Sequence, residues 1–363
     1  MIIPIGKQLK FGLNRVYQKA ETKLHDLTYF FWELTLRCNL NCLHCGSDCQ
    51  KTSEIKDMPL QDFLNVLDQV KLHFNSHKTL IVLTGGEPLM RDDLEQCGEA
   101  FLKREFPWGM VTNGFGMTEK RFKALIKSGL RSMTVSLDGL KESHNWLRNH
   151  PKSFDKAMDT ISFAVNTRNL VFDVVTCVNR RNIAELNQVK ETLINAGLKK
   201  WRLFTIFPKG RSYNNPDMDL TPVEFKTLMD FIKDTRKENR ISVEFSCEGY
   251  VGNYEFEVRD GMFFCRAGIN VGSVLADGGI SACPSLRGDY IQGNIYKDDF
   301  MDVWNNRFQV MRDRKWLKTG VCADCKEFKW CNGNGLHLRD EKTGELLRCH
   351  YNLLNQTEFK CGK

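Results

Sequence analysis

The chain has 363 residues, of which 42% are hydrophobic and 27% charged, and its formal net charge is +7. This composition is that of a globular protein with enough residues for about two domains, and it excludes collagen-like, low-complexity and wholly disordered chains. No apolar run reaches the roughly 18 residues of a transmembrane helix, and the first residues lack the apolar segment of a secretory signal, so we expect a cytoplasmic protein.

Residues 1–28 are predicted to form an amphipathic helix. Basic residues such as Lys19 and Lys23 alternate with apolar residues such as Leu9 and Leu13 at helical spacing. A basic amphipathic helix can lie on an anionic membrane surface or bind a partner. The apolar face of a helix more commonly packs on its own domain, so we expect that packing rather than membrane contact.

Residues 29–215 alternate short apolar runs with helical stretches. The expected strands are residues 29–36, 79–83, 108–112, 132–137, 172–178 and 201–206. The expected helices are residues 60–74, 92–103, 119–128, 153–166 and 183–196. Six such repeats predict parallel strands with right-handed crossovers, in a partial barrel or a doubly wound sheet. Functional residues are then expected at the C-terminal ends of the strands.

The last third of the chain differs in composition. A charged linker helix is expected within residues 216–245. Residues 246–363 have more cysteine, more glycine and little periodicity. We expect this part to be a small, loop-rich, cysteine-rich α+β domain.

Three cysteines follow the first expected strand, with the spacing Cys38-x3-Cys42-x2-Cys45. In a reducing compartment such a group indicates metal or iron–sulfur ligation rather than disulfides. Three thiolates can hold three irons of a 4Fe-4S cluster and leave the fourth iron open. A structural zinc site needs four ligands, usually from two cysteine pairs, and Cys49 would be its fourth. The spacing favours the cluster.

Polar residues and glycines also follow the other strands. Gly85-Gly86-Glu87-Pro88 comes after the second strand. Together with the three cysteines, this motif resembles the radical S-adenosylmethionine (SAM) enzymes over about residues 30–210. The resemblance implies a partial (β/α)6 TIM-like barrel, in which the methionine part of SAM chelates the open iron. It also implies reductive cleavage of SAM to a 5'-deoxyadenosyl radical, and an external electron donor such as flavodoxin or ferredoxin.

The same resemblance implies which residues contact the cofactor. Gly85 and Gly86 are expected to let the backbone approach the methionine part of SAM, and Glu87 to accept a hydrogen bond from its ammonium. The other expected cofactor contacts are Asn113, Ser136, Asp138 and Arg148. For Arg148, a surface salt bridge is the alternative.

Seven cysteines lie between Cys247 and Cys349, in a pattern similar to the SPASM extension, which carries one or two auxiliary 4Fe-4S clusters. The resemblance implies that the outer cluster is held by Cys322, Cys325, Cys331 and Cys349. The inner cluster would be held by Cys247, Cys265 and Cys283. The family usually has a further cysteine where this chain has Gly335. The fourth position is therefore His337, Cys361 or an open iron, unless the inner site is lost.

SPASM extensions occur on radical enzymes that modify peptides, so the resemblance implies oxidative modification of a peptide or protein side chain. Pro284 follows the second auxiliary cysteine, where sulfatase-maturating enzymes have an acidic residue, and this argues against sulfatase maturation. A finer similarity, over residues 31–49, is to a lipoprotein-associated group of Bacteroidetes. The alternatives are a radical SAM enzyme acting on a small metabolite and a non-catalytic iron–sulfur scaffold. No basic run indicates nucleic-acid binding.

Overall fold

The computed structural model describes residues 5–213, 215–246 and 248–356. Two of the expected cluster ligands, Cys247 and Cys361, lie outside the described residues. Among the helices of the described residues, none is long and apolar enough to cross a membrane.

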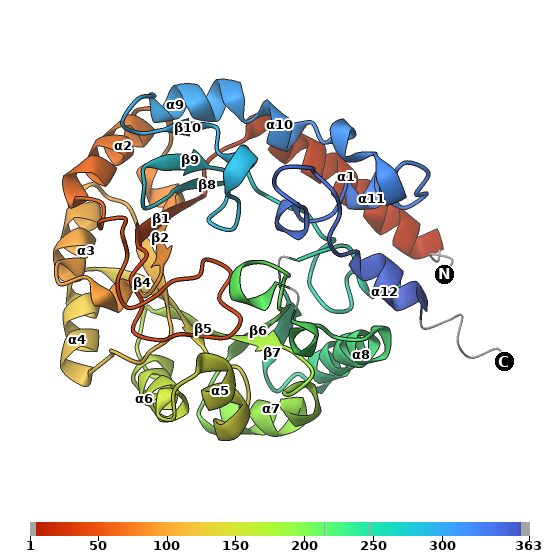
Figure 1. Cartoon of the computed structure of the whole chain (residues 1–363), viewed down its shortest axis with the longest axis horizontal. Helices are drawn as coiled ribbons and strands as arrows, with labels where there is room; N and C mark the ends of the chain where they lie inside the picture. Colours follow the sequence, from red (N-terminus) through yellow and green to blue (C-terminus); the bar gives the residue numbers. More distant parts are fainter. Residues whose placement is uncertain (1–4, 214, 247, 357–363) are drawn as a thin grey trace.

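The centre of the molecule is a ten-stranded sheet in the order β10-β9-β8-β1-β2-β3-β4-β5-β6-β7 (Figure 1). Its parallel strands β1 to β7 are Tyr29–Thr35, Leu80–Gly85, Trp108–Thr112, Leu130–Ser136, Val171–Val178, Lys200–Thr205 and Ser242–Phe245. The six expected strands are confirmed, and β7 extends the series by one. The α/β fold class with a partial barrel is therefore confirmed.

Helices follow the strands and cover the outside of the curved sheet (Figure 1). These helices are α2 Leu60–His73, α3 Leu94–Lys103, α4 Glu119–Lys127, α6 Ser153–Val165, α7 Leu186–Asn195 and α8 Pro222–Glu238. Fully buried tryptophans on the strands fill the space between the sheet and these helices. For example, Trp32 stacks on Phe63 of α2 with ring centroids 4.5 Å apart. One helix, α5 Lys141–Arg148, was not expected, because it is only eight residues long and mostly polar.

The second module continues the sheet of the barrel. Its strand β8 (Val271–Val274) pairs in parallel with β1, and β9 (Gly279–Ser281) and β10 (Gly293–Asn294) add antiparallel strands. Its helical segments are α9 Phe300–Asp302, a π-helical turn Val303–Arg307, α10 Gln309–Arg312, α11 Phe328–Cys331 and α12 His350–Gln356. The expected cysteine-rich, loop-rich α+β module is confirmed, and it is joined to the barrel along β1.

Helix α1 (Ile5–Leu24) forms as expected. It contacts the second module through Phe11, whose ring meets that of Trp330 edge-on, and through the buried Gln18. Leu9 and Leu13 are 68% and 74% exposed. Helix α1 thus packs on the protein as expected, but through Phe11 and Gln18, while the apolar side chains of Leu9 and Leu13 stay in solvent. The amphipathic pattern determines which residues share the apolar side of α1. Which side of the helix packs on the protein is determined by the shape of the protein surface under it.

Candidate SAM and iron–sulfur sites

A cavity of about 260 Å³ lies at the C-terminal ends of the barrel strands. Residues that follow β1, β2 and β3 line it, as do residues at the ends of β4, β5 and β6. The expected site residues in this lining are Cys38, Cys42, Cys45, Gly85, Gly86, Glu87, Asn113, Ser136 and Arg148. The cavity thus brings together nine of the ten residues expected in the barrel site: eight follow or end strands, and Arg148 comes from the end of α5, while Asp138 is not in the lining.

The loop that carries the first three cysteines is held by backbone contacts. The amide of Cys38 donates to the carbonyl of Gln50 at 2.7 Å. Arg211 donates to the carbonyl oxygens of Cys42 at 2.7 Å and Cys49 at 3.0 Å. These contacts turn the loop so that its thiols line the cavity.

The arrangement of these thiols suits a cluster better than a single zinc ion. Zinc binds sulfur at about 2.3 Å, which places its ligand atoms about 4 Å apart. In the described part of the chain, the three-ligand group whose atoms all lie within 4.8 Å of one another is His44, Asp138 and Cys177, not the three cysteines. A 4Fe-4S cluster separates its cysteine ligands more widely. The donor set therefore fits the cluster.

The surroundings act differently on the three thiols. Burial raises the pKa of Cys38 to about 12. A hydrogen bond with Cys49 lowers the pKa of Cys45 to about 5. Cys49 itself is buried and lines the cavity. The sequence alone named it only as the fourth ligand of the alternative zinc site. The hydrogen bond from Cys49 thus favours the thiolate form of Cys45, which is the form that binds iron.

The two glycines of the Gly85-Gly86-Glu87 motif line the cavity, but a side chain on either would point at the backbone of residues 35–37, which lead into the cysteine loop. A Cβ atom on Gly85, whose φ is +131°, would lie 2.1 Å from the carbonyl oxygen of Thr35. A Cβ atom on Gly86 would lie 2.1 Å from that of Arg37. Glycine is therefore required at both positions so that this turn can pack against the end of β1. From the sequence alone a different reason was expected, the close approach of the backbone to the methionine part of SAM.

Glu87 is 1% exposed and accepts three hydrogen bonds from the chain itself. Its Oε1 accepts from the Thr112 hydroxyl at 2.6 Å and the Leu89 amide at 3.2 Å, and its Oε2 accepts from the Asn113 amide at 2.8 Å. A carboxylate has about four acceptor positions. One position on Oε2 is left for a donor in the cavity, which fits the ammonium group of SAM.

Arg148 is buried, so the alternative of a surface salt bridge is wrong. Its Nε donates to Asp138 at 2.6 Å, and its Nη1 lies 3.8 Å from the sulfur of Cys42. Although burial acts against the charged guanidinium, the carboxylate of Asp138 raises the pKa of Arg148. Arg148 thus presents a permanent positive charge to the cysteine loop.

Asp138 does not line the cavity itself but lies within 4.8 Å of His44 and Cys177, which do, and its role as a cofactor contact stays a prediction. It is fully buried, and its Oδ1 accepts from the amide of Cys177 at 2.9 Å while its Oδ2 holds Arg148. Burial acts to raise the pKa of Asp138, but Arg148 outweighs burial and the pKa lies below its usual value. Asp138 is therefore placed to position Arg148.

Two cavity residues were not expected. Burial lowers the pKa of His44 to about 4, so its ring is neutral, and its buried Nδ1 has no hydrogen-bond partner among the described residues. Cys177, at the end of β5, was expected to be an ordinary buried thiol. Its position at the end of a strand is the signal that could have identified it.

The four cysteines of the expected outer auxiliary site come together. Cys331 and Cys349 each have Cys322 as a close electrostatic neighbour, and Cys349 also has Cys325. Burial is the main cause that raises the pKa values of Cys331 and Cys349. These four thiols fit a complete ligand set for one cluster.

The inner site has two described cysteines close together, Cys265 and Cys283. His337 is 8% exposed, and its ring fills the space that a side chain on residue 335 would need. A Cβ atom on Gly335 would lie 2.7 Å from Cε1 of His337 and 2.5 Å from the carbonyl oxygen of Glu248. His337 therefore replaces a side chain at position 335 in space, and its role as a ligand stays a prediction.

Two family models match the chain. The radical SAM superfamily model matches residues 32–193, and the SPASM iron–sulfur cluster-binding domain matches residues 265–326. An AdoMet-dependent heme synthase of Methanosarcina barkeri is 25% identical over 320 residues, covering 83% of this chain and 89% of the relative. The mycofactocin maturase MftC of Mycolicibacterium smegmatis is 25% identical over 324 residues, covering 88% and 80%. The PqqA peptide cyclase of Rhizobium meliloti is 23% identical over 310 residues, covering 82% and 79%.

Solved structures share the fold. The structure of anSMEcpe with bound AdoMet has a TM-score of 0.70 at 20% identity, and the match covers 93% of this chain and 96% of that one. Streptococcus suis SuiB bound to precursor peptide SuiA has a TM-score of 0.65 at 16% identity, with coverage of 90% and 76%. At these identities the likeness shows that the barrel and the second module are arranged as in known proteins.

Proposed function

This chain belongs to the radical SAM superfamily and carries a SPASM domain, and from that premise we propose that it oxidatively modifies a side chain of a peptide or protein. The two domains imply SAM, a 4Fe-4S cluster and auxiliary iron–sulfur clusters as its cofactors. Two relatives are named as a mycofactocin maturase and a PqqA peptide cyclase, and SuiB has been solved with its precursor peptide. Another relative is named as a heme synthase, so the substrate class needs an argument from the cavity.

The observation that carries the proposal is the charge of the barrel cavity. Among its lining residues, all of which the structure describes, Arg148 is the one arginine or lysine, and Asp138 already pairs with it. Phe204, Ile206 and Phe207 contribute apolar surface. A heme precursor carries several carboxylates, which arginines and lysines would have to bind. An uncharged side chain of a peptide fits this lining better.

The residues of the cavity have distinct tasks in this proposal. The thiolates of Cys38, Cys42 and Cys45 would hold the cluster, which with SAM supplies a 5'-deoxyadenosyl radical when bound. Glu87 would accept a hydrogen bond from the SAM ammonium through the free position on Oε2. Arg148 would balance negative charge on the thiolate of Cys42, and Asp138 would keep the guanidinium in place.

The second module would hold the auxiliary clusters. Cys322, Cys325, Cys331 and Cys349, all free thiols, would supply the complete outer set, and Cys265 and Cys283 would belong to the inner set. An oxidative modification releases electrons from the substrate, so a redox group besides the barrel cluster suits this reaction. The electron donor is proposed to be a flavodoxin or ferredoxin.

The test uses the reconstituted full chain, SAM and dithionite under anaerobic conditions, with 5'-deoxyadenosine measured by mass spectrometry. Extract of the cells that make the protein is separated by size, and the large fraction is assayed with and without protease treatment. We expect the large fraction to stimulate 5'-deoxyadenosine formation and protease to abolish the stimulation. Stimulation by the small-molecule fraction alone would instead support a metabolite substrate. Bound zinc and no 5'-deoxyadenosine would support a scaffold.

A further inference from the structure

Helix α1 presents an uncovered apolar ridge to solvent. Leu9, Leu13, Val16 and Leu24 are 68%, 74%, 67% and 62% exposed, and exposed Ala20 lies between them at helical spacing. These spacings of three and four residues place the side chains on one line along the helix. Monomeric proteins rarely expose a contiguous apolar patch of this kind unless it binds something.

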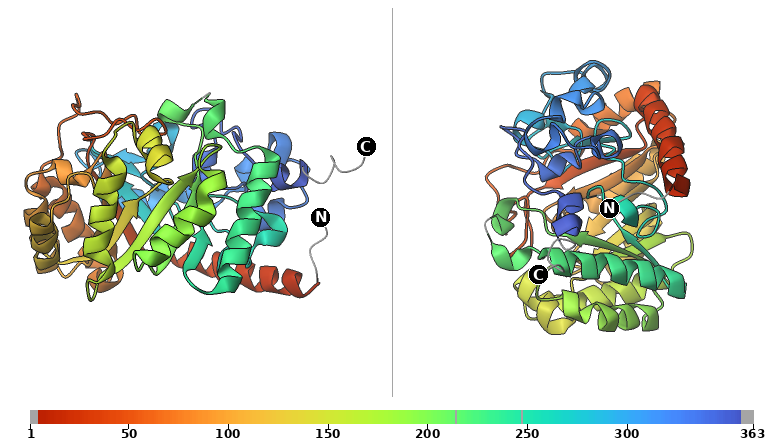
Figure 2. Two further views of the ribbon diagram at one scale, coloured as in Figure 1. Left: turned by 90° about the horizontal axis from the view of Figure 1, so that it is seen from below. Right: turned by 90° about the vertical axis from the view of Figure 1, so that its right-hand side faces the viewer.

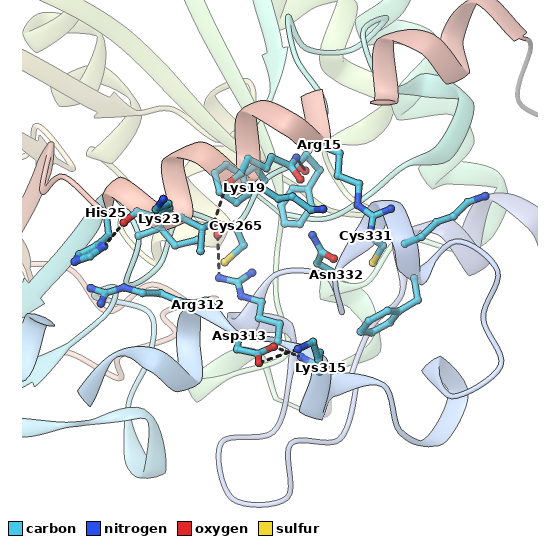
Figure 3. Close-up of a pocket in the computed structure, with 18 of the residues that line it drawn as sticks. Arg15, Lys19, Lys23, His25, Cys265, Arg312, Asp313, Lys315, Cys331 and Asn332 are labelled. Carbon is cyan, nitrogen blue, oxygen red and sulfur yellow. Dashed lines mark hydrogen bonds and ion pairs between the residues drawn. The ribbon is translucent and has the colours of Figure 1, made fainter. Parts of the chain in front are cut away.

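Positive charges flank this ridge. Lys19 and Lys23 are exposed and form no ion pair with the described residues, and Lys10 lies on the other flank, where it approaches the ring of Phe256. Figure 3 shows Arg15, Lys19 and Lys23 on one wall of a cavity of about 590 Å³, which faces Arg312 and Lys315 of the second module.

The cavity beside the ridge has an excess of positive charge. Its lining contains seven arginines and lysines and one acidic residue, Asp313, which pairs with Lys315. Arg312 donates to the carbonyl oxygens of Gly268, Asn305 and Trp304 and to no carboxylate among the described residues. Burial without an acidic partner lowers the pKa of Arg312 to about 10. Cys265 and Cys331, two of the expected cluster ligands, also line this cavity, and Arg314 lies beside Cys265, so the charge open to an external anionic group is that of Arg15, Lys19 and Lys23 on the α1 wall.

We propose that α1 docks on an anionic lipid surface, with the apolar ridge in the lipid layer and the flanking lysines at the phosphate groups. An amphipathic helix bound in this way lies parallel to the surface and buries its apolar face by about 5–10 Å. At 20 residues, α1 is about 30 Å long.

The shape of the surface favours lipid over a protein partner. A partner helix usually binds in a concave apolar groove. Here the apolar side chains form the protruding ridge of α1, and the cavity beside it is charged. This surface therefore offers a partner helix no apolar groove. In Figure 2, left, α1 lies on the side of the molecule opposite the loop that follows β1. Docking through α1 would therefore leave the barrel mouth accessible.

The test measures flotation of the full chain with vesicles of phosphatidylcholine alone and of phosphatidylcholine mixed with phosphatidylglycerol. We expect binding to the mixed vesicles, weaker binding as salt is raised, and little binding to phosphatidylcholine alone. The double variant L13E/V16E should bind at least about tenfold more weakly. L72E is the matched control, because Leu72 is 84% exposed on α2, away from the ridge.

Charge is tested separately with K19E/K23E, which should also lose about tenfold or more. K127E on α4 is its control, since Lys127 is likewise exposed. Circular dichroism and iron content should be unchanged in all variants, which shows that they fold. Three outcomes would overturn the proposal: no binding to mixed vesicles, equal binding of L13E/V16E and L72E, or a dimer that L13E/V16E dissociates while vesicle binding persists. The last outcome would assign the ridge to a second copy of the chain.

Discussion

Replacing Asp138 with asparagine is expected to destabilise the apoprotein by about 3–5 kcal/mol. Asp138 is fully buried, and its two oxygens accept from Arg148 at 2.6 Å and from the amide of Cys177 at 2.9 Å. An asparagine has one oxygen to accept these bonds, and it leaves the buried guanidinium without a counter-ion. Breaking a buried ion pair at one partner costs about this much, because the remaining charge stays desolvated.

The assay is urea unfolding followed by tryptophan fluorescence, applied to D138N, R148M and the double variant. Removing both charges should cost less than the sum of the two single losses, by about 1 kcal/mol or more. The control is D159N, because Asp159 forms an exposed pair with Lys156, and such pairs are worth about 0–1 kcal/mol. If D138N costs no more than D159N, the reasoning about the buried pair is refuted.

The pH dependence of the same pair has a definite sign. The pKa of Asp138 is lower in the folded protein than in the unfolded chain, so its contribution is present above the unfolded value of about 3.9 and is lost as the pH falls through the folded value. The pKa of Arg148 is raised, so its contribution is lost only above about 12.5. The stability difference between wild type and D138N should therefore be constant near neutral pH and shrink below about pH 4.

Five further substitutions test the site, one of them as a control. Cys42→Ala should abolish 5'-deoxyadenosine formation and remove about four irons, whereas Cys331→Ala should lower the iron content and leave some cleavage of SAM, as iron and product analysis would show. Glu87→Gln should weaken SAM binding about tenfold, because the NH2 group of glutamine cannot accept the hydrogen bonds that the carboxylate accepts. Titration calorimetry on the reconstituted protein measures this loss. Gly85→Ala should prevent stable folding, since its Cβ would lie 2.1 Å from a backbone oxygen. Gly116→Ala, with its nearest contact at 3.4 Å, should fold normally in the same urea assay.

The barrel was predictable from the sequence because each strand is a short apolar run that ends in glycine or polar residues. The ends of β3 match the expected range, and those of β1 and β6 differ from it by one residue. Helix α5 could not be found in this way, because its fold depends on burying Ser143, His144 and Leu147 against the barrel and not on an apolar repeat. The pairing of β8 with β1 also depends on contacts between segments more than 200 residues apart.

The candidate site was predictable to the level of strand ends, not of side-chain direction. Glu87 and Arg148 line the cavity as expected, whereas Asp138 lies behind the lining and binds Arg148. The direction of Asp138 depends on where α5 places Arg148, which the sequence does not reveal. The same limit explains α1, since an amphipathic pattern identifies two faces but not which of them meets the protein.

Each of the three cysteine sets has one buried arginine next to one of its cysteines. The pairs are Arg148 with Cys42 at 3.8 Å, Arg339 with Cys322 at 3.4 Å, and Arg314 with Cys265, whose pKa Arg314 lowers against the effect of burial. Metals bind cysteine as the thiolate, which burial disfavours and a neighbouring arginine favours. The first two arginines lie 106 and 17 positions from their cysteines in the chain. Cysteine spacing thus identifies the ligands, whereas the positive charge that stabilises them as thiolates is supplied by distant residues that only the fold brings near.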